Sequence, residues 1–317
     1  MAAPERVTDL DDPRLLPFRN QKDQWLRARH RGAGAAEAGS GVSGTGLAPA
    51  LPGDLFIAEG LTLLERLVAS PHRTLSVLVS EHRLAAARPV LEGVPAEAEV
   101  FVASREVVAE IVGFDLHRGV LACGRRVETH SADALIDHAG TVVVLEGLSN
   151  HDNVGSIFRS VAALAPDWPG PGPRAGVLLA AGCCDPLYRK ALRVSMGASL
   201  AVPFAEIGSW PSGLDALASS GCRVIALTPG PGSVELTAMD PPKAGERVAL
   251  VMGTEGRGLA EATLEACERA GGVRGRIAID PAVDSLNVGV AAAIALHFVR
   301  ISIGDRSCSF SHRHAPS

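Results

Sequence analysis

The sequence predicts an α/β protein with two domains, the larger built on a mostly parallel sheet. The chain has 317 residues, of which 47% are apolar, so it can bury more than one core. Apolar, β-rich runs alternate with segments of helical period along residues 141–298, and a shorter alternating series covers residues 55–123. Strands and helices that take turns form a parallel sheet covered on both faces.

The shorter series predicts a small domain over residues 54–130. An apolar run at 55–58 is followed by strands at 75–79, 100–103 and 119–123, with helices at 59–69, 81–91 and 105–112. Residues 1–53 are expected to be a basic arm and a flexible linker, because residues 32–53 contain almost no large apolar side chain.

The longer series predicts the main domain over residues 131–304. After a short helix at 132–139, strands are expected at 142–145, 176–180, 223–227, 248–252 and 276–279, with helices at 154–164, 187–196, 214–219, 259–270 and 288–298. Ligands of such sheets bind beyond the carboxyl ends of the strands. The polar tail, residues 305–317, is expected to be disordered.

Charge and composition limit the classes of partner. A net charge of −5 and a pI near 6.1 exclude a protein that coats nucleic acid by bulk charge, so any RNA contact must be local. The N-terminal cluster of basic residues is either a solvated helix face or an RNA-contacting arm, with Phe18 and Trp25 among Arg14, Arg19, Lys22, Arg27, Arg29, His30 and Arg31.

The sequence favours a soluble, cytoplasmic protein without a metal site. No run of 18 uninterrupted apolar residues occurs, and the acidic start lacks the apolar stretch of a secretory signal. The six cysteines form no CxxC pair and no zinc-like cluster, so they are interpreted as reduced core residues. A redox role for the adjacent Cys183 and Cys184 is the alternative.

The loop after the strand at 142–145 carries the first polar motif. Asn153 stands at the beginning of a predicted helix, and Arg159 lies about one and a half turns further on, off its apolar face. The forked donors of an arginine there would suit phosphate recognition. Alternatively, Asn153 is only a helix cap and Arg159 only a surface charge.

Two further loops carry similar signals. Residues 253–258 contain three glycines between a strand and a helix, a pattern that lets backbone approach a ligand, although by itself it is a weak motif. Asp284, Ser285 and Asn287 precede an almost wholly apolar helix, where they could also be no more than an N-cap cluster.

Taken together, these loops resemble the three signature motifs of the SpoU (TrmH-like) branch of the SPOUT methyltransferases. The motifs are Asn-x-Gly-x-x-x-Arg from residue 153, Met-Gly-x-Glu-Gly-x-Gly from residue 252 and Asp-Ser-Leu-Asn-Val from residue 284. The segment 184–198 is similar to the stretch that links the first two motifs. Residues 56–60 and 117–120 are similar to the family's L30e-like substrate-binding domain.

The resemblance implies an enzyme that transfers a methyl group from S-adenosylmethionine to a ribose 2′-hydroxyl of rRNA or tRNA. It also implies a deep trefoil knot in the main domain and a homodimer that completes the site. By position in the motifs, the catalytic polar set would be Arg159, Asn153, Glu255, Ser285 and Asn287. The cofactor would contact Thr228, Met252, Gly253, Ile279 and Leu286.

The expected chemistry is an in-line displacement that needs alignment and loss of a proton, and no metal. Arg159 is a poor general base because of its high pKa, so it is expected to hold a phosphate and stabilise developing alkoxide charge. The sequence leaves the proton acceptor and the RNA target open. It also departs from the family pattern, with Asp280 ahead of Pro281 and residues 149–152 replacing the usual Asp-Pro.

Two rival functions are weighed against this one. The first is a knotted RNA-binding module that has lost its activity, which the presence of all the polar motif residues disfavours. The second is a nucleotide- or NAD-binding enzyme on an ordinary doubly wound sheet. The chain lacks the GxGxxG turn and the acidic residue about twenty positions later that such enzymes use.

Overall fold

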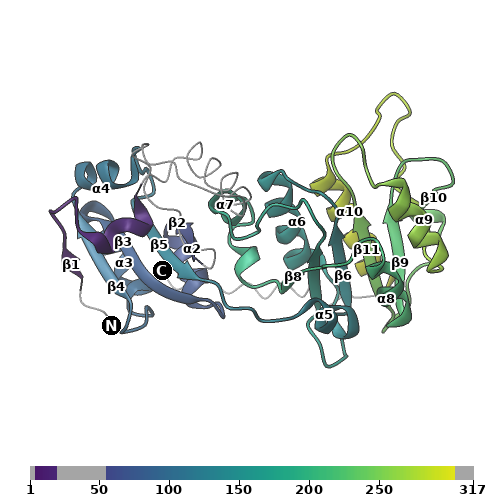
Figure 1. The fold of residues 1–317 in the computed structure, drawn as a ribbon, viewed down its shortest axis with the longest axis horizontal. Coiled ribbons are helices and arrows are strands. Elements are labelled where there is room, and N and C mark those ends of the chain that lie inside the picture. The colour runs from purple at the N-terminus through teal and green to yellow at the C-terminus, as the bar shows by residue number, and fades with distance from the viewer. Residues whose placement is uncertain (1–3, 20–54, 304–317) are drawn as a thin grey trace, which may run out of the picture. The chain divides into compact units, whose positions relative to one another are not determined.

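The computed structural model describes residues 4–19 and 55–303, which form two compact units (Figure 1). The first unit contains the described residues of Met1–Val127 together with Leu187–Leu200. The second contains Glu128–Pro186 and the described residues of Ala201–Ser317. Within the described part of the chain, no helix is long and apolar enough to cross a membrane.

The first unit is built on a five-stranded mixed sheet with the strand order β1-β4-β3-β5-β2. Strand β5 runs antiparallel to β2 and β3, while β4 is parallel to β1 and β3. Its strands are β1 (Glu5–Arg6), β2 (Leu55–Glu59), β3 (Arg73–Ser80), β4 (Glu99–Ala103) and β5 (Val120–Arg125). Its helices are η1 (Pro13–Phe18), α2 (Leu61–Val68), α3 (Glu81–Leu91), α4 (Arg105–Val112), α7 (Arg189–Val194) and η2 (Ala198–Leu200).

Residues 4–19 belong to this fold, so the boundary expected at residue 53 is wrong for that stretch. Strand β1 pairs with β4, and Val7, Leu15 and Phe18 are buried in the core of the unit. Arg14 forms ion pairs with the carboxylates of Glu5 and Asp12. The other predicted arm residues after Arg19, the linker at 32–53 and the tail at 305–317 lie outside the described residues.

The second unit confirms the predicted parallel sheet. Its seven strands lie in the order β10-β12-β9-β11-β6-β7-β8, and every pair is parallel. The strands are β6 (Thr141–Leu145), β7 (Ala175–Leu179), β8 (Phe204–Glu206), β9 (Cys222–Leu227), β10 (Val234–Glu235), β11 (Arg247–Met252) and β12 (Val273–Arg276). The helices are α5 (Ala132–His138), α6 (His151–Leu164), α8 (Gly213–Ser219), η3 (Leu236–Ala238), α9 (Glu261–Arg269) and α10 (Val288–Ser302).

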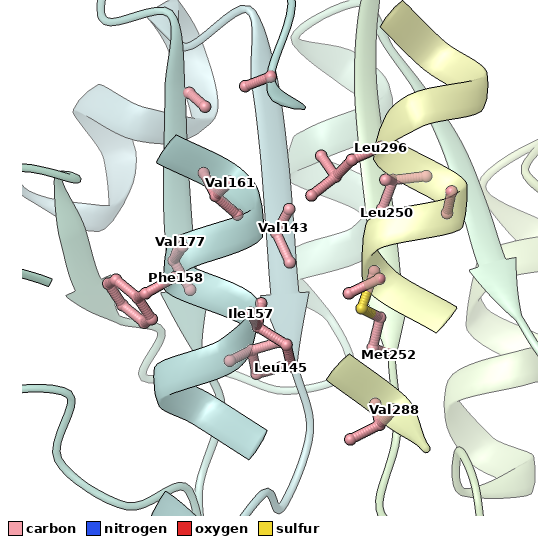
Figure 2. Packing of buried hydrophobic residues seen from close by; sticks show 14 of the residues in the cluster. Val143, Leu145, Ile157, Phe158, Val161, Val177, Leu250, Met252, Val288 and Leu296 are labelled. Carbon is pink, nitrogen blue, oxygen red and sulfur yellow. The ribbon is translucent and has the colours of Figure 1, made fainter. Parts of the chain in front are cut away.

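Helices cover both faces of this sheet, and the central strands β6 and β11 are therefore buried on both sides. On one face, Ile157 and Val161 of α6 and Leu296 of α10 pack with Val143 and Leu250 of the strands (Figure 2). Side chains of α5, α8 and α9 form the core on the other face. This packing places the beginnings of α6 and α10 at the carboxyl ends of β6 and β11.

Arg247, at the beginning of β11, ties the opposite end of the sheet together. Its buried guanidinium donates to the carbonyl of Ala139 at 2.9 Å, to that of Ser220 at 2.8 Å, and to that of Ile136. These carbonyls lie at or near the C-terminal ends of α5 and α8, where helices leave acceptors without a partner in the helix. One side chain therefore satisfies acceptors on two helices.

Three sequence-based assignments differ from the structure. Strand β12 ends at Arg276, where the predicted strand begins, so residues 277–279 are not part of a strand. The helix expected at 187–196 is limited to α7 and belongs to the first unit. The short strands β8 and β10 were not predicted.

Candidate functional site

A cavity of about 680 Å³ lies at the carboxyl ends of β9, β11 and β12. Four segments of the second unit line it, each following one of these strands or preceding α10. The lining residues lie within 227–230, 252–258, 275–279 and 284–291. The structure thus brings the second and third predicted loops to one place, at the edge of the sheet where ligands of parallel sheets bind.

The glycine-rich loop is closed on itself. The backbone N–H of Thr254 donates to the carbonyl of Gly258 at 3.0 Å, and the N–H of Gly258 donates back to Thr254 at 3.0 Å. A Cβ on Gly253 would lie 2.2 Å from the Gly258 carbonyl group, while Gly256 and Gly258 have positive φ angles of 89° and 69°. Glycine is required at 253 because the loop returns over it, and at 256 and 258 because of backbone conformation.

Asn287 joins the three motifs. Its side-chain oxygen accepts from the N–H groups of Gly289 at 2.9 Å and Val290 at 3.3 Å, so it caps α10. Its amide nitrogen donates to the side-chain oxygen of Asn153 at 2.9 Å and to Glu255 Oε1 at 2.7 Å. Asn287 is therefore the predicted N-cap of α10, and the same side chain lines the cavity and contacts Glu255.

The residues predicted to hold the cofactor all line the cavity: Thr228, Met252, Gly253, Ile279 and Leu286. Ser285 and Glu255 line it as well, whereas Asn153 is buried beside it and reaches it through Asn287. The walls combine aliphatic side chains with exposed peptide groups. Such a surface suits a flat, partly apolar ring with polar edges.

Arg159 is the predicted site residue that, within the described part of a single chain, neither lines the cavity nor forms a hydrogen bond with a residue that lines it. It is exposed on α6 and does not line the cavity. It follows Asn153 by six residues, which places the two side chains about 120° apart around the helix. Within one chain, Arg159 is therefore not directed to the side of α6 that meets Asn287.

Sequence reasoning missed several residues at the site. Arg257 and Arg276 also line the cavity. Arg276 donates to the carbonyl of Ser233 at 2.8 Å and pairs with Glu235 at 3.0 Å, which secures the segment after β9. Arg276 gave no signal in the sequence, because its partners lie about 40 residues earlier.

Glu146 was also missed, although it directly follows the buried strand β6. Its carboxylate accepts from Trp210 Nε1 at 2.7 Å, from the backbone N–H of Ala260 at 2.8 Å and from the hydroxyl of Thr263. A carboxylate at the end of a buried strand is the signal that could have identified it. Its donors lie 64 to 117 residues away in sequence.

Cys183 and Cys184 do not provide a reactive thiolate. Cys183 Sγ lies 3.1 Å from the carbonyl oxygen of Leu145, and burial raises the pKa of its thiol. Burial raises the pKa of Cys184 to about 12, with a contribution from Cys183. Both thiols are protonated near neutral pH. Among the described residues, no group of His, Cys, Asp and Glu side chains is arranged to hold a metal ion.

Comparisons with known proteins identify the family. Residues 140–297 match the SpoU rRNA Methylase family. A protein of Mycobacterium bovis named as an uncharacterized tRNA/rRNA methyltransferase is 40% identical over 293 residues, which are 92% of this chain and 90% of the relative. A protein of Mycobacterium tuberculosis with the same description is 39% identical over the same shares of both chains.

Solved structures show the same fold. The AdoMet-bound rRNA methyltransferase from Sinorhizobium meliloti has a TM-score of 0.68 and 22% identity, over 94% of this chain and 98% of that one. The SpoU methyltransferase AviRb from Streptomyces viridochromogenes, in complex with AdoMet, has a TM-score of 0.67 and 18% identity, over 92% and 98% of the two chains.

Proposed function

The chain belongs to the SpoU rRNA methylase family of RNA methyltransferases, and on this basis we propose that it methylates a ribose 2′-hydroxyl of rRNA or tRNA. The methyl donor is S-adenosylmethionine, and the reaction takes place in the cytoplasm. The observation that supports this most is the contact of Asn287 with both Asn153 and Glu255, since it unites three distant motifs beside one cavity.

The cavity fits the donor in size and chemistry. A volume of about 680 Å³ is within the range of small-molecule and cofactor sites. Leu227, Ile279 and Leu286 offer aliphatic surface for an adenine ring, and the peptide groups of the glycine-rich loop offer donors and acceptors for its edges. When bound, S-adenosylmethionine supplies a methyl group on a sulfonium, which is an electrophile that needs no metal.

The residues around the cavity would align the ribose and assist loss of its proton. Asn287 holds Glu255 by donating a hydrogen bond to its Oε1. The second carboxylate oxygen, Oε2, does not take part in this contact. Ser285 offers a hydroxyl on the opposite segment of the lining. Holding the reacting oxygen in line with the methyl group is the main contribution expected of such a site, because the displacement itself requires no covalent step on the protein.

We place Arg159 in the active site of a second subunit. Helix α10, which packs beside α6, exposes apolar side chains at Val290, Ile294 and Ile301. A second copy that covers this surface would form a homodimer, the commonest symmetric assembly. Arg159, exposed on the neighbouring helix, would then reach the substrate of its partner and contact phosphate with its forked donors.

Complementation tests the shared site. We expect chains carrying Arg159→Ala or Glu255→Ala to be inactive alone. Co-expression of the two should restore about a quarter of wild-type activity, because half of the dimers hold one intact site of two. If Arg159 acts within its own chain, the mixed dimers contain no intact site. No restored activity in isolated mixed dimers would therefore contradict the shared arrangement.

We further propose that the second unit is knotted and that the first is an L30e-like RNA-binding domain. The family supports the knot, together with a strand order in which β9 lies between β11 and β12. For the first unit, support comes from basic side chains at one end of its sheet. Arg118 packs over Gly60, and Arg83 packs over Gly119.

The experiment that tests the function is a map of ribose methylation in a strain that lacks the gene. We expect one 2′-O-methyl position of rRNA or tRNA to be lost and to return with the wild-type gene. It should not return with the Arg159→Ala variant. A map without any change, together with no binding of S-adenosylmethionine in calorimetry, would favour a non-catalytic RNA-binding protein.

A further inference from the structure

Glu146 holds a position that the proposed chemistry does not explain. Its carboxylate accepts three hydrogen bonds from groups on the segments before α8 and at the beginning of α9: Trp210 Nε1, the Ala260 N–H and the Thr263 hydroxyl. Its backbone N–H donates to the carbonyl of Met252 at 2.8 Å. It lines no part of the cavity, so it does not act on the substrate directly.

These contacts lie on both sides of the glycine-rich loop. Met252 is the last residue of β11, immediately before Gly253, and Ala260 follows the loop directly. One residue therefore fixes the two ends of the loop, through its main chain at the beginning and through its side chain at the end. Between them, the only backbone pairing in the loop is the exchange between Thr254 and Gly258.

The beginning of α9 depends on this carboxylate. The N-cap residue of α9, Ala260, has no side chain that can accept a hydrogen bond. Unpaired N–H groups at a helix N-terminus favour a negative charge, and Glu146 supplies one from the segment after β6. Thr263 in the first turn is 1% exposed, so its hydroxyl needs this acceptor as well.

We propose that Glu146 is a positioning residue that keeps the loop 253–259 in the conformation required for cofactor binding and for the placement of Glu255. This inference rests on the proposed function for its catalytic consequence, but not for its structural one. The loop carries Glu255 to Asn287, and Gly253 to the wall of the cavity. Release of Ala260 would loosen both contacts without removing any residue that faces the cavity.

Substitution of Glu146 by glutamine gives a defined mismatch. Glutamine has one acceptor oxygen and one donor nitrogen. If its oxygen accepts from Ala260, its NH₂ group faces the N–H of Trp210, and two donors meet. If it is reversed, the NH₂ group faces the N–H of Ala260. Either orientation leaves a donor without an acceptor.

A second substitution should relieve this mismatch. With Trp210→Phe, the indole donor is gone, and the Thr263 hydroxyl can rotate to accept from the glutamine NH₂ group. The glutamine oxygen then accepts from Ala260, and no two donors face each other. The double variant E146Q/W210F should therefore restore the loop, which no general loss of stability would predict.

Hydrogen exchange of the Thr254 and Gly258 amides measures the loop without reference to activity. We expect E146Q to accelerate both by about tenfold, the factor that corresponds to about 1.4 kcal/mol of lost hydrogen bonding. W210F alone should change them by less than about threefold, because Thr263 still donates to Glu146, and the double variant should resemble W210F. Calorimetry should show S-adenosylmethionine affinity falling in parallel in E146Q and recovering in the double variant.

Glu261→Gln is the matched control, because it removes a carboxylate from the first turn of the same helix but contacts Arg274 instead of the loop. Each of three results would overturn the proposal. The Thr254 and Gly258 amides could exchange at the wild-type rate in E146Q, or be accelerated in E261Q as much as in E146Q. Their exchange could also fail to slow again in the double variant. If E146Q does not fold, the double variant E146Q/W210F tests the proposal by itself. We expect it to fold and to protect the Thr254 and Gly258 amides from exchange as W210F does. An inactive wild type with this exchange pattern would refute the proposed function and leave the positioning role in place.

Discussion

Gly253→Ala is the smallest substitution that tests the geometry of the cavity. The added methyl carbon would lie 2.2 Å from the carbonyl carbon and oxygen of Gly258 and 2.3 Å from the nitrogen of Leu259. All three atoms belong to the backbone, so no side chain can rotate away. The backbone over residue 253 must therefore move.

The size of the effect follows from these contacts. Non-bonded carbons are separated by about 3.5 Å or more, so the returning strand of the loop has to shift by roughly 1 Å. Forced rearrangements of this kind cost about 1–3 kcal/mol. Because both Gly253 and Gly258 line the cavity, we expect the cost to weaken binding of S-adenosylmethionine by about 10- to 100-fold.

Isothermal titration calorimetry measures this affinity directly, and Gly208→Ala is the control. Gly208 is exposed, and a Cβ there would meet no atom within 4 Å. The control variant should bind with wild-type affinity. If Gly253→Ala also bound as tightly as wild type, the loop could not have the closed conformation described here, or it would not contact the cofactor.

Three further predictions address other parts of the molecule. Arg159→Ala should lower methyl transfer by at least about 100-fold, while cofactor affinity in calorimetry stays unchanged because the residue lies outside the cavity. Arg269→Ala, which removes an exposed arginine at the end of α9, is the control. Loss of cofactor binding in Arg159→Ala, or an equal loss of activity in the control, would contradict the prediction. Arg247→Met should lower the free energy of unfolding in urea by about 3 kcal/mol, since buried carbonyls lose their donor, and a loss below about 1 kcal/mol would contradict the described contacts. Cys184, whose pKa is raised to about 12 from 9.0, should react with iodoacetamide at pH 8 more slowly in the folded than in the unfolded chain. Equal reaction rates in the two states would contradict its burial. The raised pKa also contributes stability that is complete below pH 9 and is lost between pH 9 and 12.

The sequence predicted the regular part of the fold because burial on both faces leaves a strong pattern. The Val-rich run at 142–145 and the run at 248–252 became β6 and β11, the centre of the sheet. The hydrophobic pattern predicted the wrong strand where apolar side chains line the cavity. Ile277 and Ile279 line the cavity instead of a strand, while the actual strand β12 contains Gly275 and two arginines.

The structure of the first residues of the chain was not predicted either, because their sequence pattern is weak. Val7, Leu15 and Phe18 are too widely spaced, among charged residues, to indicate a strand and a helical turn by periodicity. Their burial depends on the sheet edge at β4, about 90 residues further on. Tertiary contacts of this kind determine structure without leaving a local signal.

Most of the residues predicted for the site lie together at the cavity, but the contacts that hold them there were not predicted. Gly253 was expected to be a glycine so that backbone could approach a ligand, whereas the structure shows that the loop itself already excludes a Cβ. Asn287 was weighed as a cap or as a catalytic residue, and it makes both kinds of contact. Glu146 directly follows a buried strand, but the sequence did not show what its carboxylate contacts, because all of its donors come from distant segments.

The most direct test of the central claim is the chemical position of the transferred methyl group. Purified protein, S-adenosylmethionine with an isotope-labelled methyl group and unmodified rRNA or tRNA are incubated together, and the RNA is then hydrolysed in alkali. A methylated 2′-oxygen cannot attack the adjacent phosphate, so we expect the label to appear in an alkali-resistant dinucleotide. Label released in a mononucleotide would place the methyl group on a base and contradict ribose methylation.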